Sequence, residues 1–177
     1  MTRIGHIQLL AEYNQWMNTK IYEAARCLSP TQLSEDKKAF FGSILGTLNH
    51  LVVADTLWLK RFANHLPNNP ALDFVRVQPM PTALAQILFA DIERLWQHRK
   101  QLDLTIREWS GLLTEADLDS ALVYSNTKGI ASNKPFFALL VHFFNHQTHH
   151  RGQVTTLLSQ EGIDIGSTDL LMLIPND

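Results

Sequence analysis

The stretch VHFFNHQTHHRGQVTTLL, residues 141–158, lies near the end of the chain and carries four histidines within nine positions. Its apolar residues recur at intervals of three and four, which is the period of a helix with one buried face. Pro135 precedes the stretch and Gly162 follows it. Proline is tolerated in the first turn of a helix, and glycine commonly follows the last one. We therefore predict a helix from Pro135 to about Gln160.

The four histidines of this helix do not all face the same way. At 100° per residue, with His146 set to zero, His150 lies at about 40°, His142 at about −40° and His149 near −60°. The apolar side chains of the helix are centred near 70°. His146 and His150 therefore fall within the breadth of the buried face, whereas His142 and His149 lie outside it or at its edge.

Two inward imidazoles one turn apart have the spacing with which helical histidines hold a single metal ion. The same spacing suits buried histidines that only form hydrogen bonds. A metal would need a third ligand from another helix. The candidates are His50, His6, His98, Asp91 and Glu93. Geometry alone does not choose among them, because His50 lies on the margin of its helix's apolar face whereas Asp55 lies inside it.

Three further helices are predicted ahead of this one. Residues 3–28 carry apolar positions at helical spacing and then reach the stop signal Ser29-Pro30. Residues 43–65 begin at a serine and contain no proline before the turn-forming sequence LPNNP. The third helix is predicted from Thr82, as a threonine cap, to about Trp109, just before Ser110-Gly111.

The connections between the predicted helices constrain the topology. Residues 66–81 form a link that is long for antiparallel neighbours, and sixteen extended residues can span roughly 50 Å. A crossover that lets the second and third helices run parallel explains this length. Residues 120–132 join a β-prone run to a turn sequence, Asn126 to Gly129, which suits a small hairpin or an ordered loop. We expect one domain over residues 1–177, an all-α four-helix bundle.

Composition excludes several classes of protein. The formal net charge is −2, and lysines and arginines are scattered without the basic stripe that a phosphate backbone requires. We therefore expect no nucleic acid as a partner. No run of 18 apolar residues occurs, so no membrane span is expected. The single cysteine, Cys27, cannot form an internal disulfide, and the N-terminal sequence lacks the features of a secretory signal, which together favour a cytoplasmic protein.

Four phrases of the sequence resemble a known family. They are YNQWMNTKIYEA (13–24), LNHLVVADTLWLKRF (48–62), VHFFNHQTHHRGQVTTLLSQEG (141–162) and IDIGSTDLLMLIP (163–175). Together they resemble the DinB, or DinB/YfiT-like, family of metal-dependent four-helix-bundle proteins over most of the chain. The most specific part is NHxxxHRGQ, which occurs here together with an H-x4-D-x2-W phrase.

This resemblance implies a ligand set and a topology. In that family one histidine of the second helix and two of the fourth hold a divalent ion, which implies His50, His146 and His150 as metal ligands here. His142 and His149 are additions that the family pattern does not require. Imidazole suits zinc, nickel, copper and iron, and we expect zinc or nickel ahead of iron or copper. The resemblance also implies an up-down-down-up order of helices and a homodimer.

An ion held by three neutral imidazoles keeps coordination positions open, as in catalytic sites. The ion would lower the pKa of a bound water or thiol, or polarise a carbonyl. The resemblance implies transfer of a low-molecular-weight thiol such as bacillithiol, or thiol-dependent isomerisation of maleylpyruvate. We expect a metal-dependent thiol S-transferase, or a related hydrolase or isomerase, that acts on a small electrophile. The alternative is a non-catalytic, metal-binding dimeric or interaction protein.

Residues near the predicted site receive further expectations. Gln153, one turn beyond His150, would orient an imidazole, contact a ligand or face solvent. Arg151 points away from the site and is expected to form a structural ion pair. Asp55 is its candidate partner, or else orients a ligand histidine. Gly152 costs the helix about 1 kcal/mol, which suggests close helix packing or the approach of a ligand.

Overall fold

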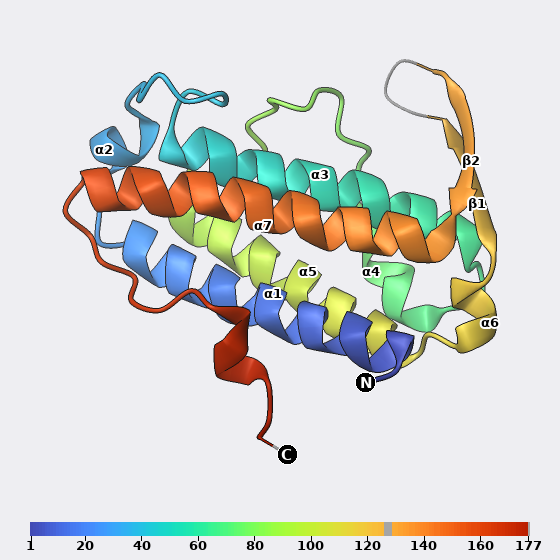
Figure 1. The fold of residues 1–177 in the computed structure, drawn as a ribbon. Helices are drawn as coiled ribbons and strands as arrows, with labels where there is room; N and C mark the ends of the chain where they lie inside the picture. Colours follow the sequence, from blue (N-terminus) through green and yellow to red (C-terminus); the bar gives the residue numbers. More distant parts are fainter. Residues whose placement is uncertain (126–128, 177) are drawn as a thin grey trace.

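The computed structural model describes residues 1–125 and 129–176, which are mostly helical with one small two-stranded sheet. Four long helices lie side by side (Figure 1). They are α1 (Arg3–Ala25), α3 (Ile44–His65), α5 (Ile92–Gly111) and α7 (Phe136–Gln160). α1 packs against α5 and α7, and α3 packs against the same two helices. Their facing sides enclose the apolar core.

The caps explain where these helices begin. Ser43 precedes α3, and its hydroxyl accepts a hydrogen bond from the backbone N–H of Gly46 at 2.9 Å. α7 starts directly after Pro135. Both beginnings agree with the predictions to within one residue. α1 ends at Ala25, three residues earlier than predicted.

The predicted start of the third helix at Thr82 is wrong, because α5 begins at Ile92 with Asp91 as its cap. The residues before it form a loop whose backbone groups are bound by a side chain of α3. Asn49 accepts hydrogen bonds from the backbone N–H groups of Leu88 and Phe89 at 2.8 and 3.0 Å. Its amide donates to the Phe89 carbonyl at 2.9 Å. These bonds satisfy the loop backbone without a helix.

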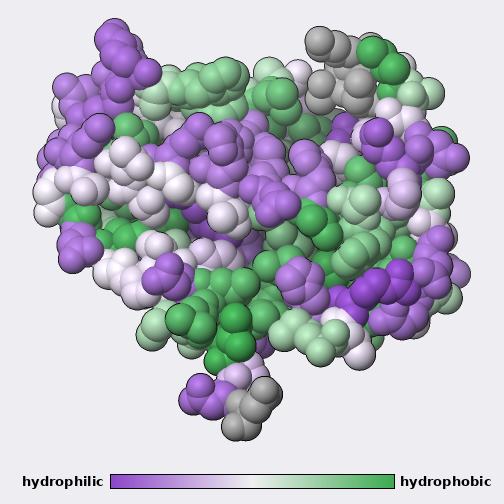
Figure 2. All heavy atoms as spheres, viewed as in Figure 1, coloured by the Kyte–Doolittle hydropathy of each residue, from purple (hydrophilic) through white to green (hydrophobic). Residues whose placement is uncertain are grey.

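Short elements fill the connections. They are α2 (Pro30–Ser34), η1 (Pro70–Leu72), α4 (Asp73–Val77), α6 (Glu115–Leu118) and η2 (Leu170–Leu173). The link predicted over residues 66–81 thus contains η1 and α4, and it continues as loop up to α5. Figure 2 shows apolar side chains gathered where Figure 1 places η2, and Leu171 and Met172 are among the exposed ones.

The predicted hairpin is confirmed. β1 (Ala121–Ser125) pairs antiparallel with β2 (Ala131–Pro135), and Ala121 lies opposite Pro135. Of the turn predicted over Asn126 to Gly129, residues 126–128 lie outside the described part of the chain. None of the described helices is long and apolar enough to cross a membrane.

A set of charged side chains is buried inside the bundle. Arg99 of α5 forms ion pairs with Asp55 of α3 and, at 2.9 Å, with Asp103 of its own helix. Asn14 and Asn18 of α1 donate to Asp103 at 3.0 and 2.8 Å. All five side chains are at most 1% exposed. We call these five residues the buried ion cluster.

This cluster corrects two expectations. Asp55 forms its ion pair with Arg99. Within the described residues it forms no ion pair with Arg151 and no hydrogen bond with a ligand histidine. Arg151 is buried and donates hydrogen bonds to Asn14 and other neutral side chains. Its guanidinium lies 5.3 Å from the ring centre of Tyr13. Position around the helix axis did not reveal Asn14 and Arg99 as partners, because they come from α1 and α5.

Candidate metal centre

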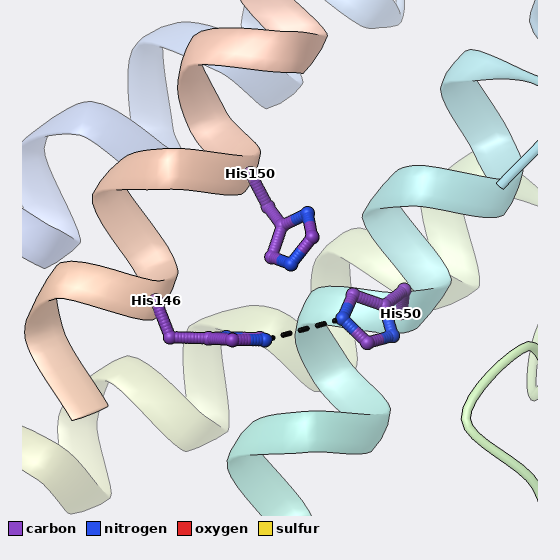
Figure 3. A group of neighbouring side chains, drawn as sticks. All are labelled: His50, His146 and His150. Carbon is purple, nitrogen blue, oxygen red and sulfur yellow. Dashed lines mark hydrogen bonds between the residues drawn. The ribbon is translucent and has the colours of Figure 1, made fainter. Parts of the chain in front are cut away.

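Three histidines from two helices converge on one point (Figure 3). His50 comes from α3, and His146 and His150 come from α7, where they lie one turn apart. Their ring centres are 4.4 to 5.2 Å apart, and one ring nitrogen of each lies within 4.8 Å of the others. His50 and His150 are buried, and His146 is half-buried. The three residues that the sequence singled out are therefore neighbours.

The spacing of the ring nitrogens suits a metal ion. Nε2 of His50 lies 3.3 Å from Nε2 of His146. Two nitrogens bound at the usual distance to a tetrahedral zinc ion are separated by roughly 3.3 Å, so a cation could accept both lone pairs. The donor set, made only of imidazole nitrogens, suits zinc, nickel, copper or iron. These residues could hold such an ion.

Hydrogen bonds fix how two of the rings are presented. Nδ1 of His50 donates to the backbone carbonyl of Leu84 at 2.9 Å, and Nδ1 of His150 donates to Oε1 of Gln153 at 2.8 Å. Because the hydrogen sits on Nδ1 in each ring, Nε2 carries the lone pair. Metal-binding histidines commonly carry such a partner. The expectation that Gln153 orients an imidazole is confirmed.

Leu84 and Phe41 were not found by sequence reasoning. Leu84 acts through its backbone carbonyl, in a segment that was predicted to be helical. The ring of Phe41 stacks on His50 with ring centres 3.7 Å apart and planes at 16°. A carbonyl carries no side-chain signal, and Phe41 stands outside any periodic segment. Only the tertiary structure shows that they enclose His50.

Burial keeps the three imidazoles uncharged. It lowers the pKa of His50 to about 4 and that of His146 to about 3, from an ordinary value of 6.5. It also lowers the pKa of His150, although the hydrogen bond to Gln153 opposes this. Neighbouring imidazoles add to the effect, because a second positive charge nearby would be repelled. At neutral pH each ring therefore has a lone pair available for a cation.

The other candidate ligands lie elsewhere. His98 packs between Phe74 and Phe89, with ring centres 5.7 and 5.1 Å away. Asp91 caps α5, and Glu93 forms an ion pair with Arg26. Neither these three residues nor His6 belongs to the possible metal-binding group found among the described residues.

The two additional histidines of α7 flank the cluster and are exposed. The ring of His142 contacts Trp58 of α3 at 5.2 Å between centres. Nε2 of His149 lies 3.2 Å from the side-chain amide nitrogen of Gln153. Both positions agree with the prediction that these residues sit at the edge of the buried face.

The expectation that Gly152 permits close helix packing is wrong, whereas the approach of a ligand there stays a prediction. This residue is exposed on α7, and a Cβ built on it would meet no atom within 4 Å beyond its chain neighbours and the backbone of its own helix turn. No neighbouring helix therefore requires a glycine there. The weak helix propensity of Gly152 is not offset by packing within the described chain.

Comparison with known proteins identifies the family of the chain. The DinB family model matches residues 1–175, and the chain belongs to the DinB family. Protein DinB of Bacillus subtilis (strain 168) is 28% identical over 160 residues, which cover 90% of this chain and 88% of that protein. No solved structure matches the chain significantly.

Proposed function

We propose that this DinB-family protein binds a divalent metal ion, zinc or nickel ahead of iron or copper, through His50, His146 and His150. We further propose that it is a metal-dependent S-transferase, which joins a low-molecular-weight thiol to a small electrophile. One observation carries the proposal: three uncharged imidazoles from two helices point their nitrogens at a common centre. Three protein ligands leave room for a substrate atom on the ion.

When bound, such an ion would lower the pKa of a coordinated thiol or water. The chain's own residues would prepare the site for it. The Leu84 carbonyl holds the ring of His50, and Gln153 holds that of His150, so neither ring must reorient when a ligand arrives. Phe41 covers one face of His50 and excludes water from that side.

We also propose that the four long helices have the up-down-down-up order and that the protein is a homodimer. The path of the chain in Figure 1 supports the helix order. After α3 the chain returns along the bundle before α5 begins, as a crossover between parallel helices requires. Light scattering after size-exclusion chromatography would test the homodimer, which a monomeric mass would refute.

The enzymatic proposal is tested by a conjugation assay. Purified protein loaded with zinc or nickel would be incubated with a panel of small thiols and electrophiles, and thioether formation followed by mass spectrometry. We expect conjugation that a chelator abolishes, that His146→Ala lacks and that His149→Ala retains. Stoichiometric metal without conjugation on the whole panel would favour the alternative, a non-catalytic metal-binding protein.

A further inference from the structure

A cleft lies between α3, the loop that precedes α5, and β1, further along α3 than His50. Its volume is about 410 Å³, which is in the range of small-molecule sites. Lys60 and Arg61 of α3, Thr82 of the loop, and Tyr124 and Ser125 of β1 are among its lining residues. Figure 1 shows the loop and the hairpin rising on the same side of α3.

The cleft carries positive charge without a matching acid. None of its described lining residues is an aspartate or glutamate. Lys60 donates to the carbonyl of Arg76 at 3.1 Å, and Arg61 donates to the carbonyl of Ser125 at 3.3 Å. Neither forms a salt bridge within the described chain.

Arg61 is held in a fixed orientation. Its guanidinium carbon lies 4.6 Å from the ring centre of Trp58 and 4.9 Å from that of Tyr124. Aromatic rings attract a guanidinium through its face, which leaves its N–H groups pointing outward in its plane. This planar fork matches the two oxygens of a carboxylate or a phosphate. Burial lowers the pKa of Lys60 and of Arg61, as expected when no carboxylate compensates the charge.

The cleft and the histidine cluster share one face of α3. Leu57 and Arg61 follow His50 by seven and eleven residues, which places both within about 20° of its direction and roughly 10 and 16 Å along the axis. The two sites also share a loop, because Thr82 lines the cleft and the Leu84 carbonyl binds His50. One elongated molecule could therefore reach both.

We propose that the cleft binds the anionic group, a carboxylate or a phosphate, of the small molecule whose reactive group lies at the three histidines. The anion site stands on the cleft, its two cations and the stacked Arg61. Only the statement that the same molecule reacts at the histidines rests on the proposed function. The substrate class is accordingly an elongated organic acid or phosphate ester.

Anion binding can be measured without turnover. Succinate and, separately, inorganic phosphate would be titrated into the full chain, and the backbone amide resonances of the lining residues Thr82 and Ser125 followed by NMR. We expect saturable binding of at least one probe at millimolar concentration. Arg61→Gln should weaken it about tenfold or more, because a charge-assisted bond is lost. Preference for one probe distinguishes a carboxylate from a phosphate site.

The matched control is Arg94→Gln, which removes an exposed arginine of α5 outside the cleft and should leave the affinity unchanged. Lys60→Gln is a second test if Arg61→Gln fails to fold, and it should also weaken binding. Absence of saturable binding to both probes, or equal affinity in the cleft variants and wild type, would overturn the proposal. His146→Ala should still bind the anion although it lacks conjugation. Anion binding by the metal-loaded wild type without conjugation on the whole panel would refute the transferase and leave the anion site standing.

Discussion

The helix α3 contributes one residue to each of two polar clusters, His50 to the histidine cluster and Asp55 to the buried ion cluster. The two clusters differ in how their atoms are paired. The buried ion cluster sets Arg99 between two carboxylates, so opposite charges meet inside the protein. The histidine cluster brings together uncharged rings whose nitrogens face one another. A cluster whose charges are paired with one another offers no site to an ion from outside, whereas like lone pairs directed at one point suit a cation. Burial alone does not distinguish the two.

The largest effect is expected in the buried ion cluster. Arg99→Met would leave Asp55 and Asp103 buried without their cation, and we expect the free energy of unfolding to fall by about 3–5 kcal/mol. Urea denaturation at pH 7 measures this change. Arg94→Met, an exposed position on the same helix, should change stability by less than about 0.5 kcal/mol. A loss below 1 kcal/mol for Arg99→Met would remove the contrast between the clusters.

The next effect concerns the hydrogen bond that orients His150. Gln153→Ala removes the acceptor for Nδ1, and we expect zinc affinity to fall about tenfold, which corresponds to about 1.4 kcal/mol. Competition with a chromophoric chelator measures the affinity. The control is Thr156→Ala, which changes an exposed residue three positions after Gln153 on α7. Unchanged affinity in Gln153→Ala would mean that this hydrogen bond does not support metal binding.

A smaller effect is predicted at Gly152, on the helix that carries His146 and His150. Gly152→Ala should stabilise the protein by up to about 1 kcal/mol, because α7 gains helix propensity and the new methyl group meets nothing. Gly46→Ala on α3 is the contrasting variant, since its Cβ would lie 2.1 Å from the carbonyl oxygen of Phe41. Thermal unfolding distinguishes them. Destabilisation by Gly152→Ala would show that something outside the described chain needs this glycine.

The smallest effect is the change in stability of the metal-free protein between pH 7 and pH 6. The pKa of His50 is lowered to about 4 and that of His146 to about 3, against about 6.5 in an unfolded chain. Below pH 6.5 the unfolded chain therefore binds protons that the folded cluster does not, so stability present above pH 6.5 is lost progressively as the pH falls toward 4. Between pH 7 and pH 6 each histidine contributes less than about 1 kcal/mol.

Urea titrations at several pH values measure this slope. His50→Ala should flatten it, and His149→Ala, which removes an exposed histidine, should not. An identical slope in wild type and His50→Ala would show that His50 is protonated equally in both states.

The sequence predicted the parts of the site that depend on one helix. His146 and His150 share a face of α7 because of their spacing, and Gln153 follows at the next turn. The choice of His50 needed the family resemblance, since its angle on α3 was ambiguous. The Leu84 carbonyl and the start of α5 were missed for one reason, namely that Asn49 binds a loop forty residues away. Arg99 was missed as the partner of Asp55 because a single charged residue within a helix has no periodic signal.

The central claim is that His50, His146 and His150 hold one metal ion. Elemental mass spectrometry of protein purified without a histidine tag measures it most directly, with His50→Ala, His146→Ala and His150→Ala beside wild type and His149→Ala as control. We predict about one divalent ion per chain in wild type and His149→Ala, and its loss in the other three variants. A wild-type protein that contains no metal and cannot be loaded with zinc or nickel would contradict the claim.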